Sequence, residues 1–220
     1  MNKSRQMIIC KCQVYKHIEQ DKLDALIEAA KNSGTQCRVV DDLCYEVIHN
    51  PEKLDGVDAI AGCHRRALKT LAKFTGETNN PVVFSINNDL DAILEKLVKS
   101  TEESENNVTF DEVPTDWVAW YPIIDADRCI HCKKCADFCL FGTYAIEDSK
   151  VKIVKPSACK TDCPACARIC PENAIIFPKS KESNLNGSLA EKIKPSKDAE
   201  STLKARLQKR KAMRLFKEDK

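Results

Sequence analysis

Two runs of four cysteines decide how this sequence folds. They read Cys129-Ile-His-Cys132-Lys-Lys-Cys135-Ala-Asp-Phe-Cys139 and Cys159-Lys-Thr-Asp-Cys163-Pro-Ala-Cys166-Ala-Arg-Ile-Cys170. Each run ends in the spacing Cys-x-x-Cys-x-x-x-Cys, and a proline follows the second run. Iron in iron–sulfur clusters binds soft thiolate donors at this kind of spacing. The stretch therefore predicts two cysteine-ligated [4Fe–4S] clusters, with a zinc–thiolate module as the alternative.

The cluster stretch is also an internal repeat. The last three cysteines of the first run recur 31 residues later, and Cys129 recurs after 30. Each half has a predicted strand before and after its cysteines. We expect residues 143–147 and 151–154 to form a hairpin, and residues 175–177 to close the small sheet.

These residues resemble the bacterial two-cluster ferredoxin domain over about residues 117–180, which implies an α+β fold. In that family the fourth cysteine of each run ligates the cluster of the other run. The resemblance therefore implies that cluster I is held by Cys129, Cys132, Cys135 and Cys170, and cluster II by Cys159, Cys163, Cys166 and Cys139. Three features depart from the family pattern, one of them the 19-residue spacer from Leu140 to Ala158, which is longer than in the smallest ferredoxins. Leu140 replaces the expected proline, and the second run opens with the longer spacing Cys-x-x-x-Cys.

The first hundred residues alternate between predicted strands and helices. The expected strands are residues 7–11, 36–40, 57–61 and 81–86. The expected helices are residues 21–33, 45–49, 64–74 and 89–99, and in the first and last of them apolar residues recur with helical spacing. This alternation predicts an α/β domain over residues 1–100, with a mostly parallel sheet and flanking helices.

Four further cysteines follow the predicted strands of this domain. Cys10 and Cys12 come at the end of the first strand, Cys44 after the second and Cys63 after the third. Sites in open parallel sheets form beyond the carboxyl ends of the strands, so we expect these thiols to converge on a metal site, with iron–sulfur favoured over zinc. The alternative is four buried structural cysteines. Cys37 lies at the opposite end of its strand and is left out of the set.

The same cysteines carry a second resemblance. The segments Ile9-Cys10-Lys-Cys12, Cys44 and Ala61-Gly62-Cys63-His-Arg resemble the amino-terminal domain of the flavin-bearing subunit of heterodisulfide reductase, over roughly residues 7–100. In that family a Cys-x-Cys pair and two later single cysteines hold a [4Fe–4S] cluster. The resemblance implies a third cluster on Cys10, Cys12, Cys44 and Cys63.

Two polar segments flank the cluster domain. Residues 101–116 are acidic and predict an exposed linker. Trp117 and Trp120 then open the cluster domain, and we expect them to pack its core; the alternative is a docking or cluster-shielding surface. Residues 181–220 hold twelve Lys or Arg and six Asp or Glu, which predicts a basic tail with a helix at residues 198–217. The tail is expected to be solvated, or to dock on an acidic redox partner.

Composition excludes several classes of protein. The 220 residues include 35 Lys or Arg and 33 Asp or Glu, a balance that demands neither nucleic acid nor a membrane as partner. The six glycines form no Gly-x-Gly, and no Gly-Lys-Ser/Thr occurs, so we expect no flavin, NAD or ATP site of those types. No apolar run reaches the roughly 18 residues of a membrane span. Thirteen clustered cysteines favour metal thiolates in the cytoplasm, where disulfides are rare.

The sequence thus predicts an iron–sulfur electron carrier, or an electron-transfer subunit of a cytoplasmic oxidoreductase with other redox proteins as partners. No catalytic residue is assigned, because no Ser/His/Asp or paired-carboxylate pattern is present. The four histidines are expected to lie outside the ligand sets, with His131 in an exposed loop. One alternative is an enzyme component whose N-terminal site reduces a disulfide or small substrate. Another is a redox sensor whose basic tail binds nucleic acid, which lacks the support of interleaved aromatic residues.

Overall fold

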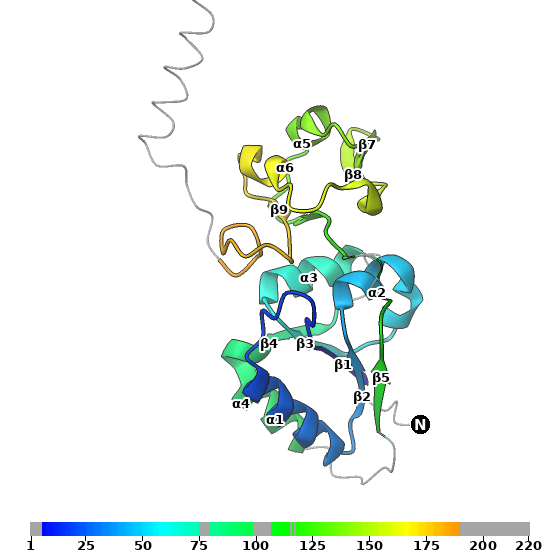
Figure 1. Ribbon diagram of the computed structural model, residues 1–220, viewed down its shortest axis with the longest axis vertical. Coiled ribbons are helices and arrows are strands. Elements are labelled where there is room, and N and C mark those ends of the chain that lie inside the picture. The colour runs from blue at the N-terminus through cyan, green and yellow to red at the C-terminus, as the bar shows by residue number, and fades with distance from the viewer. Residues whose placement is uncertain (1–5, 75–79, 99–106, 115, 117, 190–220) are drawn as a thin grey trace, which may run out of the picture. The chain divides into compact units, whose positions relative to one another are not determined.

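The computed structural model of the chain describes residues 6–74, 80–98, 107–114, 116 and 118–189 (Figure 1). The chain divides into two compact units, residues 1–190 and 191–220. All the described residues belong to the first unit. Trp117 and the helix predicted at residues 198–217 lie outside them.

The N-terminal part contains a five-stranded parallel sheet with strand order β4-β3-β1-β2-β5. The strands are β1 (Gln6–Cys10), β2 (Gln36–Val40), β3 (Ala59–Gly62), β4 (Val82–Ser85) and β5 (Val108–Asp111). The predicted α/β domain with a parallel sheet is confirmed. The three central strands are β1, β2 and β3. Their carboxyl ends lie next to one another, at the same end of the sheet.

Helices cover both faces of this sheet (Figure 1). They are α1 (Gln20–Lys31), α2 (Leu43–His49), α3 (Arg65–Phe74) and α4 (Ile86–Val98), with the 3₁₀ turn η1 (Pro51–Leu54) after α2. Helices α1 and α4 contact each other, as do α2 and α3. The buried residues Leu23, Leu26 and Ala30 of α1 share one face of the helix, as their spacing predicts.

One strand lies inside the segment that was predicted to be an exposed linker. Residues 108–111 form β5, which pairs with β2 at the edge of the sheet. The preceding Asn107 is buried, and its side chain donates to the carbonyls of Ala30 (2.8 Å) and Thr35 (3.2 Å). The linker prediction is therefore wrong for these residues. As an edge strand with Phe110 half exposed, β5 carries no strong apolar signal in the sequence.

The ferredoxin part is built from short elements. The two-stranded antiparallel sheet pairs β6 (Ile123–Ile124) with β9 (Ile175–Ile176), and β7 (Tyr144–Glu147) pairs with β8 (Lys150–Ile153). Between them lie α5 (Lys134–Phe138), the 3₁₀ turn η2 (Pro156–Ala158) and α6 (Ala165–Ile169). The predicted hairpin is confirmed, and Asp148 and Ser149 at its turn both have positive φ, 48° and 64°, as in tight hairpin turns.

The tail begins later than predicted. Leu185 is buried, and its carbonyl accepts a hydrogen bond from Phe177 N (2.8 Å). Gly187 has a φ of +86°, and a Cβ there would meet Ala67 N at 3.0 Å. Residues 185–187 therefore pack within the compact unit, and the prediction of a tail from residue 181 is wrong for this segment.

The buried residues form two hydrophobic clusters. The larger lies around the parallel sheet and contains Cys10, Cys12, Cys44 and Cys63. The smaller lies in the ferredoxin part and contains Cys135 and Cys166. Neighbouring residues of β9 divide between them, since Ile176 belongs to the larger cluster and Ile175 to the smaller. Among the described residues, no helix is long and apolar enough to cross a membrane.

Candidate iron–sulfur sites

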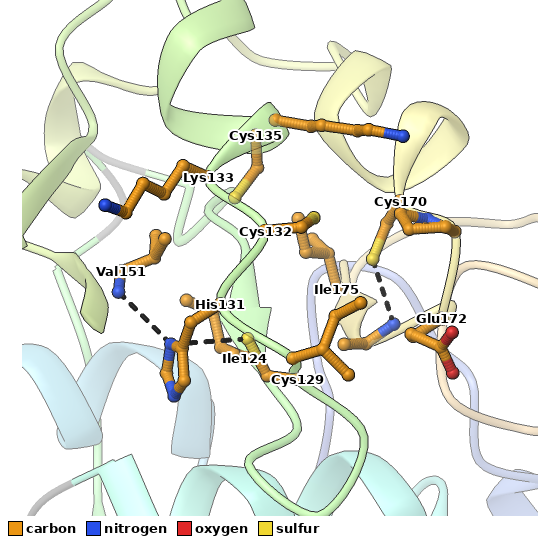
Figure 2. A pocket seen from close by; sticks show the side chains of 14 residues that line it. Ile124, Cys129, His131, Cys132, Lys133, Cys135, Val151, Cys170, Glu172 and Ile175 are labelled. Carbon is orange, nitrogen blue, oxygen red and sulfur yellow. Dashed lines mark hydrogen bonds between the residues drawn. The ribbon is translucent and has the colours of Figure 1, made fainter. Parts of the chain in front are cut away.

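The four cysteines predicted for cluster I line one pocket. Figure 2 shows the side chains of Cys129, Cys132, Cys135 and Cys170 around it. Ala174 N donates a hydrogen bond to Cys170 Sγ (3.3 Å). Bonds of this kind to cluster sulfurs tune reduction potential. The fold brings the fourth thiol, Cys170, into this pocket from the second run. Its counterpart in the first run is Cys139, 31 residues earlier.

His131 is half-buried at the same pocket, where the sequence predicted an exposed loop residue. Its Nδ1 accepts a hydrogen bond from Val151 N (3.2 Å) and lies 3.7 Å from Cys129 Sγ. The ring therefore ties the first cysteine loop to strand β8 (Figure 2). This contact gives His131 a structural role that the sequence did not predict.

The four cysteines predicted for cluster II line a second pocket. Cys139, Cys159, Cys163 and Cys166 all face a cavity of about 450 Å³. Tyr144 Oη donates a hydrogen bond to Cys166 Sγ (3.1 Å). The cysteine motif did not predict this contact. The rim of this pocket includes Phe138, Leu140 and Phe141, and Leu140 is 92% exposed.

Each short helix serves both pockets. Helix α5 carries Cys135 to the first pocket, and its C-cap residue Cys139 lies in the second. Helix α6 carries Cys166 to the second pocket, and its C-cap residue Cys170 lies in the first. The side chains are therefore grouped as the crossed ligand sets of the ferredoxin resemblance require.

The internal repeat is visible in the backbone as well as in the cysteines. His131 and Asp162, 31 residues apart, have φ values of 51° and 60°. Gly142 and Asn173, again 31 residues apart, have φ values of 68° and 46°. Left-handed residues are uncommon outside glycine, so the two cysteine loops share their backbone conformation at these positions. The likeness is partial, because Lys133 has a φ of 65° whereas its counterpart Pro164 has a φ of −93°.

Burial makes free thiolates costly in both pockets. It raises the pKa of Cys135 and Cys166 to about 11, and that of Cys159 to about 12. Cys139 differs: burial opposes ionisation there too, but hydrogen bonds from Thr143, Phe141 and Gly142 bring its pKa below the ordinary value. Metal binding deprotonates such thiols, because the thiolate is the form that ligates the metal.

Cys10, Cys12, Cys44 and Cys63 converge at the carboxyl edge of the parallel sheet, as the strand order predicts. All four are buried, with no more than 6% of any residue exposed. Cys63 Sγ donates to Cys12 Sγ, and the charges of Cys10 and Cys44 also act on Cys63. Cys37 lies apart from them near the start of β2, where it pairs with Met7, and burial raises its pKa to about 12.

Backbone contacts hold the segments of this site in place. Leu43 N donates to Cys10 Sγ (3.3 Å). Tyr121 Oη donates to the carbonyl of Cys44 (2.6 Å), and Ser85 Oγ donates to the carbonyl of Cys63 (2.7 Å). Tyr121 belongs to the ferredoxin part, so that part supports the N-terminal site directly.

The N-terminal thiols differ sharply in acidity. Burial and the neighbouring Cys12 raise the pKa of Cys10 to about 12, and burial raises that of Cys44 well above its usual range. The hydrogen bond to Cys12, together with burial, also raises the pKa of Cys63 well above its usual range. That same hydrogen bond lowers the pKa of Cys12 to about 7. Without a metal, only one of the four thiols ionises readily near neutral pH.

Lys179 is a functional candidate that sequence reasoning missed. It follows β9, yet its side chain is buried beside the N-terminal cysteines and its Nζ lies 2.5 Å from Asp42 Oδ2. Burial alone would lower its pKa, but the charges of Cys44 and Asp42 raise it above the ordinary value. No local pattern around residue 179 marks it, because its partners lie 137 residues earlier in the chain.

The donor sets fit iron–sulfur clusters in their chemistry. All thirteen cysteines are free thiols. In the described part of the chain, no three Cys, His, Asp or Glu side chains are arranged to hold a single metal ion. A cluster does not require such convergence, because each thiolate binds a different iron. The space between the cysteines is only about 20 Å³ in the first pocket, so a cluster there requires their side chains to move apart.

Comparison with known proteins gives this part of the chain a class. Residues 121–184 match the family described as the 4Fe-4S dicluster domain. The chain is also 48% identical over 65 residues to an uncharacterized ferredoxin of Methanocaldococcus jannaschii. That match covers 29% of this chain and 44% of the relative, so the chain spans less than half of the relative's length.

Residues 121–184 are therefore a 4Fe–4S dicluster ferredoxin domain, which implies two [4Fe–4S] clusters and electron transport. The domain extends four residues beyond its predicted end at residue 180. The comparisons give no support to the resemblance between residues 7–100 and heterodisulfide reductase.

Proposed function

We propose that this chain is an electron-transfer protein with three [4Fe–4S] clusters, acting as a conduit or as one component of a cytoplasmic oxidoreductase. The observation that carries the proposal is the grouping of twelve cysteines into three sets of four. Cluster I would be held by Cys129, Cys132, Cys135 and Cys170, and cluster II by Cys159, Cys163, Cys166 and Cys139. The third would be held by Cys10, Cys12, Cys44 and Cys63.

The clusters, when bound, supply one-electron redox chemistry, and the chain supplies ligands, spacing and shielding. Ala174 N and Tyr144 Oη donate hydrogen bonds to ligand sulfurs of clusters I and II. Around the N-terminal set, the large apolar core excludes water. The chain thus offers two partly exposed redox sites and one buried site.

Exchange with partner proteins is proposed at the ferredoxin pockets. Cys132 is exposed at the first pocket. Leu140 and Phe138 give the second an exposed apolar rim. The burial of the N-terminal set favours a relay or storage site over a site where a disulfide substrate binds, because such a substrate has to reach the metal centre.

Iron and acid-labile sulfide counting tests the proposal. An anaerobically prepared chain is expected to hold about twelve iron atoms, four for each cluster. A chain with about eight would lack the N-terminal cluster and keep the ferredoxin pair. A chain with four atoms or fewer, or one bearing zinc in the ferredoxin pockets, would overturn the electron-transfer proposal itself.

A further inference from the structure

The buried ion pair between Lys179 and Asp42 joins two parts of the chain that are far apart in sequence. Lys179 lies after β9 in the ferredoxin part, whereas Asp42 is the N-cap residue of α2 in the sheet domain. Both side chains are almost fully buried, at 2% and 3% exposure. Burying a lysine is costly, and a buried pair is weak grounds for stability by itself. The charges of the pair still act on neighbouring groups, because electrostatic interactions are strong at low dielectric.

The surroundings of Lys179 point to the cysteine site. Its positive charge acts on Cys10, Cys12 and Cys44. The Nζ atom also lies 5.9 Å from the centre of the Tyr15 ring. Asp42 meanwhile accepts a hydrogen bond from Cys44 N (2.9 Å), which fixes the segment carrying that cysteine.

The position of Lys179 is held by the backbone on both sides. Ser180 N donates to the carbonyl of Phe177 (2.9 Å), and Phe177 N donates to the carbonyl of Leu185 (2.8 Å). The Phe177 ring stacks on Trp120 with centroids 5.3 Å apart. The lysine therefore enters the N-terminal site from a segment that is anchored in the core of the ferredoxin part.

We propose that Lys179, which belongs to the ferredoxin part, raises the reduction potential of the N-terminal cluster through its positive charge. This inference rests on the third cluster proposed above. Reduction adds negative charge to a site that already holds four thiolates and Asp42. A fixed cation at low dielectric stabilises the more negative state strongly, so Lys179 raises the potential and Asp42 lowers it.

Opposite substitutions separate this role from a structural one. Lys179→Met removes the cation while keeping a long apolar side chain, and it should lower the potential. Asp42→Asn removes the anion but keeps an oxygen that can cap α2, and it should raise the potential. Lys179→Arg keeps the charge and should restore the wild-type potential within a small shift. Loss of packing alone would not move two variants in opposite directions.

The experiment is a potentiometric titration of the reconstituted full chain followed by electron paramagnetic resonance. Each charge removal is expected to change the ratio of reduced to oxidised N-terminal cluster at least tenfold, which is 59 mV for one electron. The signals of the two ferredoxin clusters should stay in place. Lys152→Met is the matched control, because Lys152 pairs with Glu147 in an exposed ion pair on the β7–β8 hairpin.

The outcomes distinguish the two proposals. About eight iron atoms in the wild-type chain would remove the third cluster, and this inference with it. About twelve iron atoms with unshifted potentials in both variants, or with shifts of the same sign, would overturn the role of Lys179 and leave the third cluster standing. If Lys179→Met does not fold, Asp42→Asn decides: a rise supports the role of the buried charges, and an unchanged potential overturns it.

Discussion

The ferredoxin sites and the N-terminal site use the same donor atoms in opposite surroundings. The eight ferredoxin cysteines lie in short loops and helices, and several are half-buried or exposed. The four N-terminal cysteines lie inside the largest apolar core of the described chain. Both regions have N–H or O–H donors to cysteine sulfur, but in addition a buried lysine and aspartate lie beside the N-terminal thiols.

The difference shows two ways of assembling four thiols. In the ferredoxin part, spacing along the chain brings the ligands together, helped by left-handed residues at matching positions of the repeat. In the N-terminal part, the order of parallel strands brings together segments up to 53 residues apart. The first kind of site can form locally, and the second needs the whole sheet. The two should therefore respond differently to substitutions.

Removing one cysteine from each region has the largest expected effect. Cys63→Ala and Cys166→Ala should each lower the iron content by about four atoms per chain. The two variants should lose different clusters. Cys63→Ala should keep the electron paramagnetic resonance signals of both ferredoxin clusters, and Cys166→Ala should keep that of the N-terminal cluster. Iron analysis with electron paramagnetic resonance of the reduced protein measures both.

Cys37→Ala is the control for that pair. Cys37 is as deeply buried as the N-terminal set but lies at the start of β2, away from the other thiols. Full iron content is expected in this variant. A loss of about four atoms from Cys37→Ala, or none from Cys63→Ala, would contradict the assignment of the third set.

How far the sequence predicted these sites depended on the range of the contacts. The ferredoxin ligand groups follow from spacing, and the convergence of Cys10, Cys12, Cys44 and Cys63 follows from the alternation of strands and helices. Lys179 could not be predicted, because a lysine between Pro178 and Ser180 has no local pattern and its burial depends on Asp42. The edge strand β5 was not predicted for a related reason. Its pairing with β2, rather than its own sequence, makes it a strand.

Burial of aromatic side chains gives the second comparison. Phe177 is fully buried in the ferredoxin core, where it stacks on Trp120, whereas Phe138 on the rim of the second pocket is about half exposed. Phe177→Ala should lower the free energy of unfolding by about 3–5 kcal/mol through lost burial and a residual cavity. Phe138→Ala should change it by less than about 0.5 kcal/mol, as at most surface positions.

Denaturant unfolding of the iron-loaded protein, followed by the visible absorbance of the clusters, measures this difference. Because Phe177 anchors the segment that bears Lys179, the N-terminal cluster should be lost along with ferredoxin stability. Equal midpoints for Phe177→Ala and the wild type would show that the stacked pair contributes nothing to the junction between the two regions.

The smallest expected effect compares two left-handed glycines. Gly187 packs against Ala67 of helix α3, where an added Cβ would lie 3.0 Å from a backbone nitrogen, while Gly142 near the second pocket has open space around it. Gly142→Ala should cost only the backbone strain, about 1–2 kcal/mol. Gly187→Ala adds a clash with a backbone that cannot turn aside, so it should cost about 1 kcal/mol more, within the usual cost of overpacking. The same unfolding measurement compares the two variants. If Gly187→Ala proves no more destabilising than Gly142→Ala, Gly187 does not pack against α3 as closely as the structure shows.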